Sequence, residues 1–240
     1  MSEKIFFVMP AYNEEENIKN VVEQWSRKVD ELVGTGVDAW LAIANDGSKD
    51  ATYATLQELK KEYPRLIPLD KPNSGHGATV MYLYNYAINH GADYIFQTDS
   101  DGQTNPDEFD CFWAERAKWD LQIGSRKGRQ DGFSRVVVTK VLKGVVRLTF
   151  GVSVPDANTP FRLMNVKTTR PVLELIPNDF FLSNVALSAI AVKKGLKNRW
   201  MPITFKPRQG GVNSINLRRI IKIGRKALFD FIKINRSLGM

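Results

Sequence analysis

The segment KIFFVMPAYNEEEN, residues 4–17, sets the pattern for the fold. Its apolar run at residues 4–9 is short and ends at a proline, as expected of a buried strand in a parallel sheet. Asn13 is a favourable helix N-cap, and the glutamates that follow it favour the positive end of a helix dipole. Apolar residues at helical spacing then predict a helix that ends near Leu32.

The same strand, turn and helix recur along the chain. Apolar runs at residues 40–44, 66–69 and 94–98 predict three more strands, with helices at about 50–63 and 77–90 between them. Such alternation with short connections predicts an α/β fold with a mainly parallel sheet and helices on both faces. Because ligands of these sheets bind beyond the carboxyl ends of the strands, three polar turns should converge at one crevice. These turns are Pro10-Ala-Tyr-Asn-Glu14, Asp46-Gly-Ser48 and Asp99-Ser-Asp-Gly-Gln103.

Beyond residue 125 the pattern becomes less regular. We expect helices at residues 133–150, 180–194 and 217–235 and a strand at 199–205. The last helix has apolar residues at three- and four-residue spacing and basic residues on much of its remaining circumference. A basic amphipathic helix of this kind can lie at an anionic membrane surface or pack on its own domain. We therefore expect a main domain at residues 1–215 and a C-terminal amphipathic helix at 216–240.

Composition narrows the class of protein. The chain has 240 residues, of which 43% are hydrophobic and 25% charged, as expected of one globular domain. Its one cysteine, Cys111, excludes an intramolecular disulfide and a cysteine-built zinc site and favours a reducing compartment. No segment has the length and apolar character of a membrane span or signal peptide. We expect a cytoplasmic protein, which could be peripheral at the cytoplasmic face of a membrane.

The formal net charge of +8 suggests an anionic partner. The basic excess lies mainly near the C-terminus, where Asp230 is the one acidic residue after residue 205. A nucleic-acid-binding module would account for such a charge. We do not expect one, because no stacking aromatics are interleaved with these basic residues and the acids at the strand ends would repel phosphates.

Two carboxylates on one tight turn, Asp99 and Asp101, indicate a cation site at the end of a buried strand. Hard divalent ions such as Mg²⁺ or Mn²⁺ take such oxygen ligands and commonly bridge carboxylates to a diphosphate. Gln103 adds a further oxygen. The alternative is a solvated acidic turn. The phosphate-binding glycine motifs of P-loop and standard dinucleotide-binding proteins are absent, and Gly75-His-Gly77 is a lone G-x-G at a helix start that could be a simple tight turn.

Seven short motifs, taken in order, resemble the family 2 glycosyltransferases, which are inverting enzymes with the Rossmann-like GT-A fold. The likeness is greatest to the subgroup that makes dolichyl- and polyprenyl-phosphate sugars, and it spans about residues 4–215. The motifs are Met9-Pro-Ala-Tyr-Asn-Glu14, Asn45-Asp-Gly-Ser48 with Asp50, Asn73-Ser-Gly-His-Gly77, Asp99-Ser-Asp-Gly-Gln103 with Pro106, Gly124-Ser-Arg126, Asp156-Ala-Asn-Thr-Pro-Phe-Arg162, and Arg208-Gln-Gly-Gly with Ser214.

The resemblance implies metal-dependent transfer of a sugar from a nucleotide-diphosphate donor. It implies that Asp99, Asp101 and Gln103 bind Mg²⁺ or Mn²⁺ on the diphosphate. His76 stands where related motifs often have lysine. The residues that would bind the donor are Pro10, Ala11, Tyr12, Glu14, Asp46, His76, Asp99, Ser100 and Arg208.

The acceptor is a separate question. A hydroxyl acceptor needs a general base, whereas a phosphate monoester is already largely ionised at neutral pH. Many hydroxyl-using members have an acid near the start of the helix expected at residues 180–194, whereas this chain has Phe181-Leu-Ser-Asn-Val185 there, and Asn184 cannot accept a proton. This difference favours polyprenyl phosphate over a saccharide hydroxyl in polysaccharide or glycan synthesis. Asp156 and Asp179 remain possible bases. Three arginines could contact phosphate oxygens or, as the alternative, form ion pairs with surface carboxylates. The predicted catalytic residues are Asp101, Arg126, Asp156, Arg162 and Asp179, with Arg208 as the third arginine.

Nucleotidyl transfer is a further alternative, because those enzymes have a similar fold and handle nucleotide sugars. Their usual glycine- and arginine-rich loop after the first strand is missing from Pro10-Ala-Tyr-Asn-Glu14. A glycosyltransferase without a membrane span would act on a lipid-linked acceptor as a peripheral protein or with a membrane-protein partner.

Overall fold

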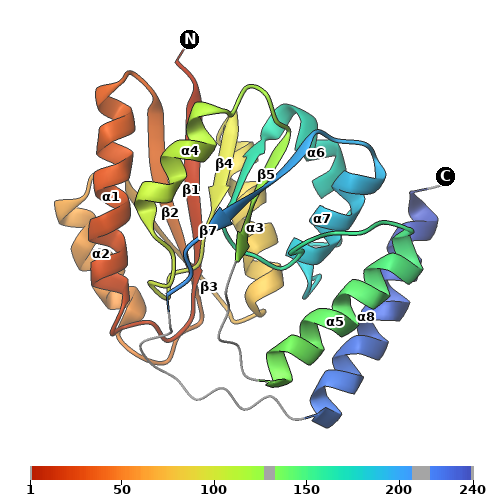
Figure 1. The fold of residues 1–240 in the computed structure, drawn as a ribbon. Coiled ribbons are helices and arrows are strands. Elements are labelled where there is room, and N and C mark those ends of the chain that lie inside the picture. The colour runs from red at the N-terminus through yellow and green to blue at the C-terminus, as the bar shows by residue number, and fades with distance from the viewer. Residues whose placement is uncertain (1, 127–132, 207–216, 239–240) are drawn as a thin grey trace.

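The computed structural model describes residues 2–126, 133–206 and 217–238, and within these residues the strands form one sheet (Figure 1). Its order is β3-β2-β1-β4-β6-β5-β7. Neighbouring strands are parallel except for β6, which runs antiparallel to both β4 and β5. The mainly parallel sheet is therefore confirmed. The strands are β1 (Lys4–Ala11), β2 (Asp38–Asp46), β3 (Leu66–Lys71), β4 (Tyr94–Gln97), β5 (Leu121–Arg126), β6 (Arg162–Asn165) and β7 (Asn198–Ile203).

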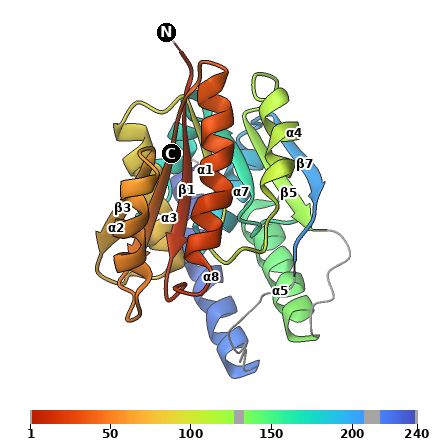
Figure 2. The same ribbon diagram turned by 90° about the vertical axis from the view of Figure 1, so that its left-hand side faces the viewer.

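Helices cover both faces of the sheet (Figures 1 and 2). Alternation along β1 shows the two layers, because Phe6 and Val8 belong to one hydrophobic cluster and Ile5 and Phe7 belong to the other. The helices are α1 (Ile18–Gly34), α2 (Thr52–Glu62), α3 (His76–Asn89), the 3₁₀ turn η1 (Pro106–Glu108), α4 (Phe109–Ala114), α5 (Phe133–Phe150), α6 (Val166–Leu173), α7 (Ser183–Lys193) and α8 (Leu217–Ser237).

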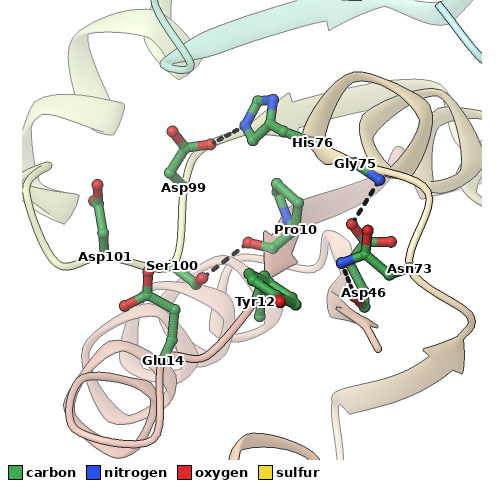
Figure 3. Close-up of a pocket in the computed structure, with 11 residues that line it drawn as sticks. Pro10, Tyr12, Glu14, Asp46, Asn73, Gly75, His76, Asp99, Ser100 and Asp101 are labelled. Carbon is green, nitrogen blue, oxygen red and sulfur yellow. Dashed lines mark hydrogen bonds and ion pairs between the residues drawn. The ribbon is translucent and has the colours of Figure 1, made fainter. Parts of the chain in front are cut away.

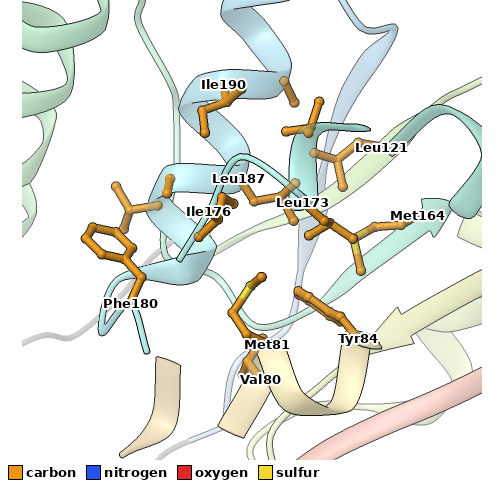
Figure 4. Close-up of a cluster of buried hydrophobic side chains, with 14 of the residues drawn as sticks. Val80, Met81, Tyr84, Leu121, Met164, Leu173, Ile176, Phe180, Leu187 and Ile190 are labelled. Atoms are coloured by element: carbon orange, nitrogen blue, oxygen red, sulfur yellow. The ribbon is translucent and has the colours of Figure 1, made fainter. Parts of the chain in front are cut away.

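One of these clusters fixes the start of α3 against the sheet. Val80 and Tyr84 of α3 and Leu187 and Ile190 of α7 are fully buried members of it (Figure 4). Gly77 is essential to this contact, since a Cβ there would lie 2.3 Å from the carbonyl oxygen of Phe180. The packing therefore holds the first turn of α3 at the carboxyl edge of the sheet.

Several boundaries differ from the sequence expectation. Helix α1 begins at Ile18, so Asn13 is not its cap. Asn13 instead has a φ of 53°, and its side-chain oxygen accepts from the backbone N–H of Lys49 at 2.9 Å. Strand β6 and helix α6 were not expected, and α7 begins three residues later than predicted, at Ser183.

Candidate active site

A cavity of about 440 Å³ lies beyond the carboxyl ends of β1, β2 and β4 (Figure 3). Asp46 and Asp101 both line it, as the convergence of strand ends predicts. The predicted donor residues lie together here, apart from Arg208, which is outside the described residues. The lining residues are Pro10, Ala11, Tyr12, Glu14, Asp46, Asn73, Gly75, His76, Asp99, Ser100 and Asp101.

The loop after β1 is held in place by backbone hydrogen bonds to its neighbours. The backbone N–H of Asn13 donates to the hydroxyl of Ser48 at 3.0 Å, and that of Glu14 donates to the hydroxyl of Thr52 at 2.9 Å. The hydroxyl of Ser100 donates to the carbonyl of Pro10 at 2.8 Å, which joins the β4 turn to the same loop (Figure 3). This fixed loop presents Tyr12 to solvent at the cavity with 45% of its surface exposed.

Asp46 organises the loop that follows β3. Its carboxylate accepts from Nζ of Lys71 at 2.5 Å and from the backbone N–H groups of Ser74 and Gly75 at 2.8 and 2.9 Å. Burial alone would raise the pKa of Asp46, but the hydrogen bonds from Lys71 and Ser74 hold this pKa below its ordinary value. Asp46 is therefore an anion whose hydrogen bonds shape the wall of the cavity.

Gly47 lets the loops after β2 and β3 meet. Its φ is 65°, and a Cβ at this position would lie 2.7 Å from the backbone nitrogen of Asn73. The side-chain amide of Asn73 donates to the carbonyl of Asp46 at 2.8 Å. Lys71 and Asn73 were given no site role from the sequence, although Lys71 ends a strand at the same edge of the sheet and that position could have identified it.

His76 and Asp99 form a pair at the start of α3. Nε2 of His76 lies 2.9 Å from Oδ1 of Asp99 (Figure 3). Desolvation opposes a charge on His76, but the carboxylates of Asp99, Asp101 and Asp46 outweigh it and raise the pKa of His76 above its ordinary value. The cavity therefore has a concentrated negative charge that favours a cation.

Asp99 and Asp101 suit a cation that is shared with a bound diphosphate. Among the described residues, no three His, Cys, Asp or Glu side chains lie close enough together to hold a metal ion. Mg²⁺ is commonly held by one or two carboxylates together with substrate phosphates and water, and two aspartates on one turn match that donor set. Gln103 differs from expectation: it is not among the cavity-lining residues, and its side-chain amide donates to the carbonyl of Lys206 at 2.7 Å.

Arg126 and Asp156 pair with each other. Nε and Nη2 of Arg126 lie 2.9 and 2.8 Å from the two carboxylate oxygens of Asp156, and both side chains are largely buried. Burial would raise the pKa of Asp156, but Arg126 lowers it below its ordinary value. Neither residue lines the cavity. In this structure the two charges satisfy each other, which is the alternative to a phosphate contact for Arg126, and the phosphate contact of Arg126 and the basic role of Asp156 stay predictions.

Arg162 supports the core. It begins β6 with none of its surface exposed, and its Nε and Nη atoms donate to protein acceptors. Burial lowers the pKa of Arg162 to about 10. No part of this side chain is exposed, so the structure offers no open donor for the phosphate contact that the sequence predicts. The acceptors are the carbonyl oxygens of Ala157, Thr159 and Asn184 and the hydroxyl of Ser188.

Asp179 does not line the cavity that holds Asp46 and Asp101. It lines a second cavity, of about 340 Å³, between the loop before α7 and helix α8. The backbone at Phe180 and Phe181, which packs on Gly77, also borders this cavity. The proposed base Asp179 is thus outside the set of residues that gather around Asp101.

Comparison with known proteins agrees with this arrangement. The family model described as glycosyl transferase family 2 matches residues 6–140. The chain is 24% identical over 237 residues to a polyprenol monophosphomannose synthase of Mycolicibacterium smegmatis, covering 95% of this chain and 85% of the relative. It is 31% identical over 240 residues to a dolichyl-phosphate beta-glucosyltransferase of Trichomonas vaginalis, covering 95% and 71% of the two chains.

A solved structure has the same fold. It is the glucosyl-3-phosphoglycerate synthase of Mycobacterium tuberculosis in complex with Mn²⁺ and uridine-diphosphate-glucose. The TM-score is 0.66 at 17% identity, with 97% of this chain and 79% of the other covered. This likeness confirms the GT-A fold expected from the sequence.

Proposed function

The chain belongs to glycosyl transferase family 2 and is a glycosyltransferase, and we propose that it transfers a sugar from a nucleoside-diphosphate donor to polyprenyl phosphate. The observation that carries the proposal is the single cavity bordered by Asp46, Asp99 and Asp101 at the carboxyl edge of the sheet. The names of the two relatives support the acceptor class, since both describe sugar transfer linked to a polyprenyl or dolichyl phosphate. The structural neighbour with uridine-diphosphate-glucose supports the donor class.

Asp99 and Asp101 would hold Mg²⁺ or Mn²⁺, which supplies a Lewis acid for the charge that develops on the departing nucleoside diphosphate. Pro10, Ala11 and Tyr12 would bind the base and ribose, because their loop is fixed by hydrogen bonds and opens into the same cavity. Attack by the acceptor oxygen on C1, from the face opposite the leaving group, breaks the bond to the diphosphate and inverts the anomeric centre.

The positions of the possible bases favour a phosphate acceptor over a sugar hydroxyl. Asp156 forms an ion pair with Arg126, and Asp179 lines the second cavity. Asn184 is buried, and its amide oxygen is not a base. A phosphate monoester attacks without a base, since it is already ionised at neutral pH. The surroundings of these three side chains therefore suit polyprenyl phosphate.

A transfer assay tests this function directly. Purified protein is incubated with a panel of UDP-, GDP- and dTDP-sugars, Mn²⁺ or Mg²⁺, and either polyprenyl phosphate or an oligosaccharide. The expected result is sugar transfer to the lipid phosphate with release of a nucleoside diphosphate. Transfer only to the oligosaccharide would contradict the acceptor, and release of pyrophosphate would indicate nucleotidyl transfer instead.

The substitution Asp101→Asn tests the metal site within this assay. It should reduce turnover by about a hundredfold or more, because it removes one carboxylate from the ion that stabilises the leaving group. Asp107→Asn is the matched control, since Asp107 is an exposed acid that does not line the cavity. Equal turnover of Asp101→Asn and wild type would refute the metal assignment.

We also propose that the protein works on the surface of a membrane, at its cytoplasmic face, where a long polyprenyl chain would hold the acceptor. It could act there as a peripheral protein or beside a membrane-protein partner. No helix in the described part of the chain is long and apolar enough to cross a bilayer.

A further inference from the structure

Lys71, the last residue of β3, has its ammonium group where a strand end, a loop and a helix meet. Nζ donates to Oδ1 of Asp46 at the end of β2, at 2.5 Å, and lies 3.3 Å from the hydroxyl of Thr79 in the first turn of α3. It also donates to the carbonyl of Pro72 at 2.8 Å and to the hydroxyl of Ser74 at 2.6 Å, both in the loop between β3 and α3. One ammonium group therefore joins β2, this loop and the start of α3.

The hydrogen bonds of this ammonium group are largely shielded from water. The side chain of Lys71 is 14% exposed and that of Asp46 is 4% exposed, so water can replace few of these bonds. Hydrogen bonds to a charged group are roughly twice as strong as neutral ones. An ammonium group has three protons on a compact charge, which suits acceptors that surround it from several directions. The position of the loop therefore depends on this cation.

The loop is held from two sides at Ser74. Its backbone N–H donates to Asp46 at 2.8 Å, while its hydroxyl accepts from Lys71. The next residue, Gly75, has a φ of 87° and donates its backbone N–H to Asp46 at 2.9 Å (Figure 3). Gly75 and His76 line the cavity, whereas Lys71 and Ser74 do not. Lys71 therefore acts on the cavity through the loop.

We propose that Lys71 is a positioning residue for the nucleoside-diphosphate donor, because it holds Gly75 and His76 in their places at the cavity before the donor binds. This inference rests on the proposed function, which assigns the cavity to that donor. A loop that is already ordered loses less conformational entropy when a ligand binds. Without the ammonium group of Lys71, part of the binding free energy of the donor would go into ordering the loop.

The substitution Lys71→Met tests the proposal, since methionine donates no hydrogen bond. Isothermal titration calorimetry with UDP, GDP and dTDP in the presence of Mn²⁺ identifies the nucleotide that wild type binds, and Lys71→Met should bind it about tenfold more weakly. Ser74→Ala is a milder variant, which removes one acceptor of Lys71 from the exposed loop and should weaken binding about threefold. Lys60→Met is the matched control, because Lys60 donates to the carbonyl of Pro64 at 2.8 Å and does not line the cavity. Equal binding by wild type and Lys71→Met, or an equal loss in Lys60→Met, would overturn the proposal.

Kinetic constants separate positioning from a loss of folded protein. A variant that merely folds less well has fewer active molecules, so its apparent kcat falls while the KM for the donor stays constant. Lys71→Met should instead raise the KM for the donor about tenfold and keep kcat within about twofold of wild type, because saturating donor orders the loop. A lower kcat with an unchanged KM would show that Lys71 has a structural role alone.

Amide hydrogen exchange of the free protein distinguishes failure of this proposal from failure of the proposed function. The backbone N–H groups of Ser74 and Gly75 should exchange about tenfold faster in Lys71→Met than in wild type, and at the wild-type rate in Lys60→Met. Unchanged exchange would show that Lys71 does not hold the loop, and faster exchange with wild-type donor binding would refute its effect on the donor. Wild type that binds none of the three nucleotides would refute the proposed function and the donor part of this inference. Exchange alone would then decide whether Lys71 fixes the loop.

Discussion

Asp46 is the residue whose charge most directly shapes the cavity. Replacing it with asparagine leaves the largely buried ammonium of Lys71 without its anionic partner and weakens the hydrogen bonds from Ser74 and Gly75. We expect Asp46→Asn to lower the free energy of unfolding by about 3 kcal/mol, as when one partner of a buried ion pair is removed. Urea denaturation monitored by tryptophan fluorescence measures this change.

The double variant Asp46→Asn/Lys71→Met is the control for that experiment. It removes the unpaired ammonium and should recover part of the lost stability, because methionine has no charge that must be taken out of water. A double variant no more stable than Asp46→Asn would show that the ion pair is not the cause. Wild-type stability in Asp46→Asn would contradict the role of Asp46 in fixing the loop.

A substitution at Gly77 tests the close approach between α3 and the loop before α7. Gly77→Ala places a methyl group against the carbonyl of Phe180, and we expect it to lower the free energy of unfolding by about 1–3 kcal/mol through overpacking. Gly144→Ala is the matched control, since its added Cβ meets nothing within 4 Å in helix α5. It should stabilise the protein by about 0.5–1 kcal/mol. Urea denaturation measures the free energy of unfolding of both variants. A Gly77→Ala protein as stable as wild type would refute the contact.

At the level of the elements, the Arg126–Asp156 pair joins the end of β5 to the segment before β6. Because the folded-state pKa of Asp156 lies below its ordinary value, this carboxylate stabilises the fold fully above about pH 4. That contribution is lost as the pH falls through the folded-state pKa. Asp156→Asn should therefore cost about 3 kcal/mol at pH 7 and progressively less below about pH 4.

Urea midpoints of wild type and Asp156→Asn, measured from pH 7 to pH 3, give the difference in stability at each pH. Asp107→Asn serves as the control, because Asp107 is exposed. A wild-type advantage that stays constant down to pH 3, or that grows with acid, would contradict the sign of this linkage.

The strands and helices also show how much of the fold could be predicted from the sequence. The strands and helices of residues 4–97 could be predicted because each strand is a short apolar run and each connection has turn residues. The convergence of Asp46 and Asp101 followed from sheet topology. Strand β6 could not be found this way, since Arg162-Leu-Met-Asn165 is four residues long and begins with a charge that tertiary contacts bury. The same contacts bury Arg162, whereas its place in the sequence suggested a donor open to phosphate.

Pairing of charges also explains the positions of Arg126 and Asp156. From the sequence alone, Arg126 and Asp156 could be exposed and separate or could pair with each other. Only the fold, in which β5 ends beside the segment before β6, brings them within 2.9 Å. The common location of the residues that border the cavity could be predicted because these residues follow strands directly. Asp156, Arg162 and Asp179 follow irregular segments whose direction depends on packing.

On the scale of the whole molecule, we propose that residues 1–215 form the catalytic domain and that 216–240 add the helix that packs on it. The described side chains of α8 support this division, since Ala227 and Phe231 are buried in the cluster that also contains Phe150. The helix therefore contributes to the core on one side while its other side remains available for a partner.

Binding of donor and metal should stabilise the molecule as a whole. At a ligand concentration one hundred times its Kd, binding to the native state adds about 2.7 kcal/mol, which for a chain of this size corresponds to about 5–10 °C in Tm. We expect a nucleoside-diphosphate sugar with Mn²⁺ to give a shift of this order in a thermal-shift assay, and chelation by EDTA to remove most of it. In Asp99→Asn/Asp101→Asn the shift should no longer depend on Mn²⁺, because the cation loses both of its protein carboxylates, while Asp107→Asn should respond as wild type does. A full shift for the wild type in EDTA would mean that the donor binds without a cation at these aspartates.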